Sequence, residues 1–254
     1  MHHLHFFFGS VANNVTDAIL PATVDPVFVT NNSRVRTINP RRLIAAQAIV
    51  VDGLQAKLDY PSAYQLFRPS IYPIDTDVTA PNLPAIDYYG DTGFLLPGGE
   101  DIGVLVSRAG AAAGNVYGYL WTAERFVAAP KGGIRSLRAT AAVVTTAAGV
   151  PNFGPITLDQ QLPNGRYQVV GMALEGANTV AGRLIFPGQA ERPGVPSNIS
   201  AASHIQPLFR KGYSGVFGNF LNTNLPQLEV VGSGVTSTQT LYLDIVQLGG
   251  GIGS

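Results

Sequence analysis

The stretch Thr238-Gln-Thr-Leu-Tyr-Leu-Asp-Ile-Val-Gln-Leu248 carries the clearest pattern in the chain. Leu241, Leu243 and Ile245 recur at every second position, and Thr240, Tyr242, Asp244 and Val246 lie between and beside them. Successive side chains of a strand point to opposite faces, so a period of two is typical of a β-strand with one face in a core. The stretch therefore predicts a half-buried strand.

Other segments repeat this pattern. Residues 166–174 are rich in strand-forming residues and follow the turn sequence Pro163-Asn-Gly165, and residues 136–146 are a β-branched and alanine-rich run. Helical spacing is rare, and short helices are expected only at residues 81–89 and 198–206. Short strands separated by Pro- and Gly-rich connections predict an all-β sandwich.

The chain also resembles itself at a shift of about 125 residues. Ala48-Ile-Val-Val-Asp-Gly53 aligns with Gly171-Met-Ala-Leu-Glu-Gly176, and residues 116–121 align with residues 241–246. Because this period is too long for a solenoid, it predicts two copies of one domain, with chance likeness between β-rich halves as the alternative. The predicted parts are an N-terminal arm and first strand (1–29), a first domain (30–130) and a second domain (131–254), with the boundary near residues 128–133.

Composition excludes several classes of protein. Hydrophobic residues make up 46% of the chain, charged residues 13%, and the net charge is zero, so neither a disordered chain nor a generally basic nucleic-acid binder is expected. Cysteine is absent from the sequence, which excludes disulfides and Cys-based metal sites. The apolar stretch at residues 43–51 is too short for a membrane helix. So low a charge favours surfaces that are buried between subunits.

Catalytic residue types are scarce. His204 is the one histidine beyond the first five residues, and no G-x-S-x-G elbow provides a serine nucleophile. We therefore predict that the protein is not an enzyme, and we expect no cofactor.

The first twelve residues, MHHLHFFFGSVA, lack Lys and Arg, and their apolar run is too short for a signal peptide. They are predicted to form an extended arm or a first strand. Three adjacent aromatic residues, Phe6, Phe7 and Phe8, would anchor the arm on a neighbouring subunit, since burial of each is worth about 1.5–3 kcal/mol. His2, His3 and His5 would offer metal ligands in an ordered arm, but solvated histidines are expected.

Charges are unevenly distributed. Four arginines lie within nine residues, Arg34, Arg36, Arg41 and Arg42. Guanidinium groups bind phosphate and carboxylate bidentately, so this cluster predicts an anion-facing or interface patch. The alternative is the solvated edge of a sheet. The run from residue 75 to 101 is acidic, and Asp75 and Asp77 are a weak candidate Ca²⁺ site beside the alternative of a solvated loop.

Two tandem β-sandwiches without Cys or catalytic residues resemble the double jelly-roll major capsid proteins of tailless icosahedral viruses, many of which enclose a membrane. The likeness lies in architecture over residues 30–248. It implies two tandem eight-stranded jelly-roll sandwiches side by side, with their longest loops at the equivalent residues 75–99 and 187–212.

The resemblance implies a structural role in the virion. Three subunits would form a homotrimer with six sandwiches, a pseudo-hexamer that tiles an icosahedral shell. Its partners would be neighbouring capsomers, minor capsid proteins, and internal membrane lipids or the genome. The alternative is a two-domain binding module such as a virion spike, adhesin or lectin-like protein, in which Trp121 and tyrosines would stack on sugars. A cupin-like enzyme shares the fold pattern but needs more histidines.

Overall fold

The computed structural model describes residues 2–23, 25, 28–31, 33–50, 52–62, 74–75, 86–90, 93–110, 112–130, 132–198 and 207–248. Within these ranges the protein is all-β, with strands joined by turns and by a short 3-10 turn at Pro207–Phe209. The helix expected at residues 198–206 lies almost wholly outside the described residues. So does most of the helix expected at 81–89, although Asp87–Tyr88 is a short strand, β8. No described helix is long and apolar enough to cross a membrane.

The chain divides into two compact units. One comprises Leu4–Arg125, here called the first unit, and the other comprises Met1–His3 with Phe126–Ser254, the second unit. The division falls shortly before the segment 128–133 in which the sequence predicts a boundary. Residues 4–29 belong to the first unit and do not form a separate part of the chain.

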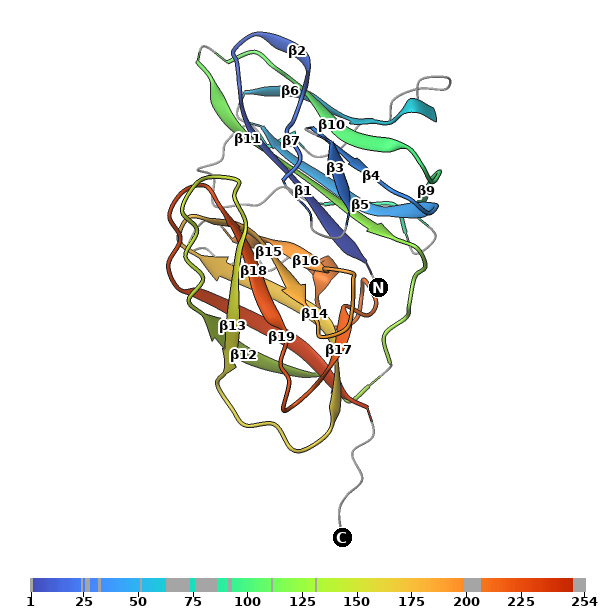
Figure 1. The fold of residues 1–254 in the computed structure, drawn as a ribbon, viewed down its shortest axis with the longest axis vertical. Helices are drawn as coiled ribbons and strands as arrows, with labels where there is room; N and C mark the ends of the chain where they lie inside the picture. Colours follow the sequence, from blue (N-terminus) through green and yellow to red (C-terminus); the bar gives the residue numbers. More distant parts are fainter. Residues whose placement is uncertain are drawn as a thin grey trace. The chain divides into compact units, whose positions relative to one another are not determined.

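The second unit is built on one eight-stranded sheet (Figure 1). Its order is β16-β15-β18-β13-β12-β19-β14-β17, and β16 also pairs with β14, so the sheet returns on itself. The strands are β12 (Arg135–Ala141), β13 (Asn152–Leu158), β14 (Arg166–Gly176), β15 (Thr179–Ile185), β16 (Gly194–Asn198), β17 (Gly218–Leu221), β18 (Gln227–Gly232) and β19 (Gln239–Gln247).

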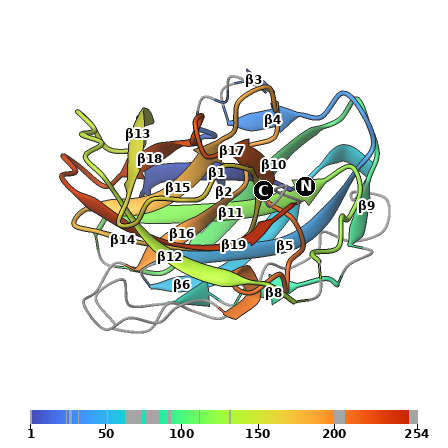
Figure 2. The same ribbon diagram turned by 90° about the horizontal axis from the view of Figure 1, so that it is seen from below.

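The first unit contains two sheets, whose strands are labelled in Figures 1 and 2. One has the order β1-β11-β5-β7, with β8 and β9 also paired to β5, and the other has the order β2-β10-β4-β3, with β6 also paired to β10. Besides β8, the strands are β1 (His3–Val11), β2 (Val15–Ile19), β3 (Val29–Asn31), β4 (Arg34–Arg36), β5 (Arg41–Val50), β6 (Gly53–Asp59), β7 (Ile74–Asp75), β9 (Phe94–Leu96), β10 (Asp101–Arg108) and β11 (Gly114–Ala123).

The two units share a pairing plan. β5 pairs antiparallel with β11 and β9 and parallel with β7, and β14 pairs antiparallel with β19 and β17 and parallel with β16. Likewise β10 lies between β2 and β6, as β18 lies between β13 and β15. The main difference is the connection before β5, which contains the β3–β4 hairpin, whereas residues 159–165 alone connect β13 to β14.

The strand predicted from residues 238–248 is present as β19. Leu241, Leu243 and Ile245 are at most 2% exposed, as the alternation predicts. The opposite face of the strand is expected to be exposed to solvent, but Asp244 and Val246 on that face are also buried. The backbone N–H of Lys211 donates to Asp244 Oδ2 at 2.7 Å, so the segment around Lys211 covers this face.

Candidate functional site

The aromatic cluster of the N-terminal segment lies inside a sheet. Phe6 and Phe7 are 2% and 0% exposed within β1, and Phe8 is half-buried. Their partners lie on the adjacent β11, where the ring of Tyr119 is 5.4 Å from that of Phe6 and the ring of Tyr117 is 5.3 Å from that of Phe8. The prediction of an arm anchored on a neighbouring subunit is therefore wrong for Phe6 and Phe7. Phe7 lies in the hydrophobic core of the first unit, away from water, and Phe6 packs on Tyr119 of β11 in the same unit.

Two of the four clustered arginines form ion pairs within the first unit. Arg34 Nη2 lies 2.6 Å from Asp59 Oδ2, and Arg36 Nε lies 2.7 Å from Asp101 Oδ1. These carboxylates belong to β6 and β10, and β10 pairs with both β6 and the short strand β4. Arg34 and Arg36 are therefore occupied by carboxylates of their own unit and do not form an open anion-facing row.

Arg41 is buried and fills one end of the first unit. It is 3% exposed, donates from Nε to Thr122 Oγ1 at 3.0 Å, and lies over the ring of Phe28 at 5.0 Å. Its Nη1 is 3.6 Å from Glu124 Oε1, and Thr122 Oγ1 is also 2.8 Å from His5 Nε2. Because solvent does not reach Arg41, the prediction that it faces an external anion is wrong.

Arg42 points the other way from β5 and is half-buried. It lies opposite Leu95 of β9 in the register. The two Ca²⁺ candidates lie outside the described part of the structure, Asp77 entirely and Asp75 with its side chain. The same holds for His204.

Two ion networks stabilise the second unit. Glu229 of β18 accepts hydrogen bonds from Arg183 Nε at 3.0 Å, Arg183 Nη2 at 2.9 Å and Arg192 Nη1 at 2.9 Å. Arg183 and Glu229 are both 3% exposed. Because both oxygens of this carboxylate accept hydrogen bonds from the two guanidinium groups, Glu229 stabilises the fold and is not offered to a ligand.

Asp244 is the centre of the other network. Burial raises the pKa of this carboxyl, but hydrogen bonds from Arg210, Ser136 and the backbone N–H of Lys211 outweigh burial, so the pKa is lowered overall. Arg210 donates from Nε at 2.7 Å and from Nη2 at 2.8 Å, and Ser136 Oγ donates at 2.6 Å. A carboxylate held in its charged form by a guanidinium is a poor general base, so Ser136 is not activated for attack.

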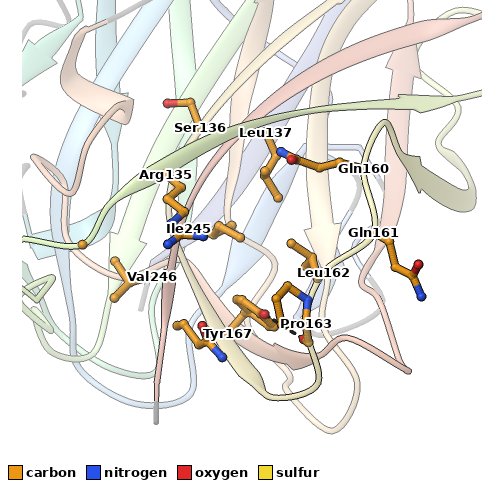
Figure 3. Close-up of a pocket in the computed structure, with 12 residues that line it drawn as sticks. Arg135, Ser136, Leu137, Gln160, Gln161, Leu162, Pro163, Tyr167, Ile245 and Val246 are labelled. Carbon is orange, nitrogen blue, oxygen red and sulfur yellow. Dashed lines mark hydrogen bonds between the residues drawn. The ribbon is translucent and has the colours of Figure 1, made fainter. Parts of the chain in front are cut away.

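The second unit has an open cavity of about 540 Å³ at one end, here called the end cavity (Figure 3). Its walls come from β12, the start of β14, the end of β19 and the connection 159–165. They consist of Gly133, Arg135, Ser136, Leu137, Gln160, Gln161, Leu162, Pro163, Tyr167, Ile245, Val246 and Gln247. Sequence analysis missed this site, although the shortness of the connection was a usable signal.

The first unit shows why this end is open in the second. Tyr167 and Gln247 are opposite each other in the register of β14 and β19, and Leu43 and Thr122 are opposite each other at the matching place in β5 and β11. In the first unit the longer connection before β5 brings Phe28 onto Arg41 beside Thr122. In the second unit the matching connection consists of residues 159–165 alone, and it does not fill the space at this end of the sheet.

A shallower pocket of about 390 Å³ lies at the edge of the second unit. It is lined by Arg166, Pro187, Gln189, Asn219, Phe220, Leu221 and Asn224. Arg166 and Leu221 lie opposite each other in the register of β14 and β17.

Comparisons with known proteins add little. No family model matches the chain, and no curated protein matches it significantly. Among solved structures, a xanthan lyase from Paenibacillus aligns with a TM-score of 0.26 and 10% identity, over 96% of this chain and 25% of the lyase chain. The chain thus spans about a quarter of that protein.

Proposed function

We propose that the protein is a structural subunit of a virus shell, a major capsid protein with two tandem jelly-roll sandwiches. The observation that carries the proposal is the strand order. Numbered one to eight along the chain from β12, the strands of the second unit fall into the rows 5-4-7-2 and 1-8-3-6. Eight strands in two interlocked Greek keys define the jelly roll, and these rows fit that arrangement.

The first unit supports the same assignment. Its β1, β11 and β5 correspond to β12, β19 and β14, and its β2, β10 and β6 correspond to β13, β18 and β15. Two copies of one sandwich plan in a single chain are what a subunit needs if three copies are to present six similar sandwiches around a ring. A closed ring of this kind uses the same surfaces repeatedly.

An arginine that faces an exposed leucine on the next strand repeats in both units. Arg42 lies opposite Leu95 in the first unit, and Arg166 lies opposite Leu221 in the second. Leu95 and Leu221 are 55% and 51% exposed, and each lies on a strand at the edge of its sheet.

Folding alone does not require this repetition. The inward neighbours, Leu43 with Phe94 and Tyr167 with Phe220, pack into the cores, whereas Leu95 and Leu221 face solvent in the isolated chain. An exposed leucine retained at the matching place of both copies favours a contact that each sandwich makes with a neighbour. We assign these two positions to the homotrimer interfaces.

The test measures mass in solution. The wild-type protein is expected to form a particle of about 80 kDa, three chains of 26.8 kDa, or larger assemblies built from it. The double variant Leu95→Asp with Leu221→Asp should shift the distribution to monomer, because an aspartate would be desolvated at each interface.

Leu54→Asp is the matched control. Leu54 is also an exposed leucine, at 66%, but the residue at its matching place, Val180, is buried. This variant should assemble as the wild type does. A monomeric wild type at micromolar concentration, with no ordered particles in electron micrographs, would contradict the proposal.

The second candidate function is a binding module, and the end cavity is the observation that favours it. The sugar-stacking version of this idea loses its main residue, since Trp121 is 1% exposed. A stable monomer that binds a ligand in the end cavity would favour this candidate over the capsid subunit.

A further inference from the structure

We infer that the end cavity of the second unit binds a small amphiphilic anion, with a carboxylate or phosphate head on Arg135 and a single alkyl chain on the apolar floor. The inference does not depend on the proposed capsid role, because the whole site lies within one unit of one chain.

The floor of the cavity is apolar. Leu137, Ile245 and Tyr167 are at most 3% exposed and belong to the neighbouring strands β12, β19 and β14. Leu162 and Pro163 of the connection line the same space, as Figure 3 shows, and because they are half-buried and exposed they provide the apolar surface that a ligand can reach above this buried base. A volume of about 540 Å³ is within the usual range of small-molecule sites, which lie preferentially in concave, mostly apolar places.

Charge at the rim is positive. Arg135 lies directly opposite Ile245 in the register and two residues from Leu137, so its side chain leaves the same face of the sheet as the floor residues. The other polar side chains of the lining are the amides of Gln160, Gln161 and Gln247, whereas Ser136 donates its hydroxyl to Asp244 on the opposite face of the sheet. No carboxylate lines the cavity, so the single guanidinium makes it selective for anions.

The lining disfavours a sugar as the ligand. Sugars stack on open aromatic faces, and the one aromatic residue of the lining, Tyr167, is 3% exposed. Its hydroxyl donates to the carbonyl oxygen of Pro163 at 2.8 Å, drawn as a dashed line in Figure 3, which fixes the ring within the wall.

The first unit shows what this end of the fold accommodates. There a guanidinium, that of Arg41, lies 5.0 Å from the ring of Phe28, next to Thr122. An apolar group against a cation therefore fills the matching space in the first unit. In the second unit the place of Arg41 is taken by Gly165, so neither that cation nor the ring is present there, and Arg135 of β12 is the cation that lines the open space.

The test is isothermal titration calorimetry of the purified protein with decanoate, below its micellar concentration. Saturable binding at one site per chain is expected, and Arg135→Gln should weaken it at least tenfold, because a charge-assisted hydrogen bond is lost. Arg138→Gln is the matched control: Arg138 is exposed on the same strand, three residues on and outside the lining. Its variant should bind within twofold of the wild type.

Two further ligands and one further variant separate the possible sources of binding. Decyl phosphate tests the phosphate head and decanol the uncharged chain, and at least one anion should bind ten times more tightly than decanol. Leu162→Trp, which fills the cavity from the connection, should abolish binding of both decanoate and decyl phosphate while the thermal transition is retained.

Three results would overturn the inference. The first is the absence of saturable binding of either anion to the wild type. The second is an equal loss in Arg135→Gln and Arg138→Gln, which would indicate general attraction to a basic strand. The third is decanol binding as tightly as both anions, which would leave Arg135 without a role.

Discussion

Substitution of Glu229 by glutamine should destabilise the second unit more than any other single-charge change. Glu229 is 3% exposed and accepts three hydrogen bonds, two from Arg183 and one from Arg192. In Glu229→Gln one carboxylate oxygen becomes an NH₂ group that points at guanidinium donors. The buried Arg183 then keeps its charge without the carboxylate of Glu229.

The size of the effect follows from burial. Removing one partner of a buried ion pair typically costs about 3–5 kcal/mol, because the remaining charge is not solvated. For a unit of this size, that corresponds to a fall of about 10 °C or more in the melting temperature. Replacing both members, Arg183→Met with Glu229→Met, should cost less than Glu229→Gln alone, because no uncompensated charge then stays buried.

Differential scanning calorimetry measures this prediction. The transitions can be assigned, because Trp121 is the one tryptophan of the sequence and is buried in the first unit, so its fluorescence follows that unit. Glu175→Gln, the same change at a half-buried position of β14, is the control and should stay within about 0.5 kcal/mol of the wild type. An equal effect of Glu229→Gln and Glu175→Gln would refute the reasoning.

Two further predictions concern other parts of the second unit. Burial lowers the pKa of His2 from 6.5 to about 3, so the folded state excludes a proton that the unfolded chain binds, and stability should be complete above pH 6.5 and fall as the pH drops from 6.5 towards 3. His2 packs edge-on against Phe217 at 4.5 Å, and His2→Phe should reduce the fall in melting temperature between pH 7 and 5; an unchanged pH dependence would contradict this assignment. At Gly218 a Cβ would lie 2.5 Å from Cδ2 of the buried Phe186, so Gly218→Ala should cost about 1–3 kcal/mol in denaturant unfolding. Gly234→Ala, where a Cβ meets nothing within 4 Å, should be nearly neutral, and equal effects at the two glycines would count against the steric argument.

Much of the fold could be predicted from alternation and from the internal repeat. The 125-residue shift aligns residues 41–50 with β14 and residues 114–123 with β19, because strands packed on both sides keep the same sequence pattern wherever they occur. The all-β class and the strand at residues 238–248 followed from a period of two alone.

The functional residues were harder to predict, for physical reasons. A row of aromatic residues in a sequence does not reveal whether its own unit or a neighbouring subunit covers it. Phe7 lies in the core of the first unit, and Phe6 packs on Tyr119 of β11. Clustered arginines do not reveal their carboxylate partners, since Asp59 and Asp101 are distant in sequence from Arg34 and Arg36. The end cavity depends on where residues 160–163 lie in space, which no local pattern encodes.

Among the described residues, the two units differ in the connection before β5 and before β14, and this difference has a chemical consequence. Each unit has an arginine in this region, but on strands that do not correspond, Arg41 at the start of β5 in the first unit and Arg135 at the start of β12 in the second. The long connection of the first unit supplies Phe28, so Arg41 is removed from solvent and has a structural role only. The short connection of the second unit supplies no ring, so Arg135 stays exposed above an apolar floor. Because the strands themselves are equivalent, a ligand in the second unit would replace in space what the chain itself provides in the first. The shared pairing plan thus explains how two copies can pair their strands alike while the described part of the second unit keeps an accessible cavity at this end.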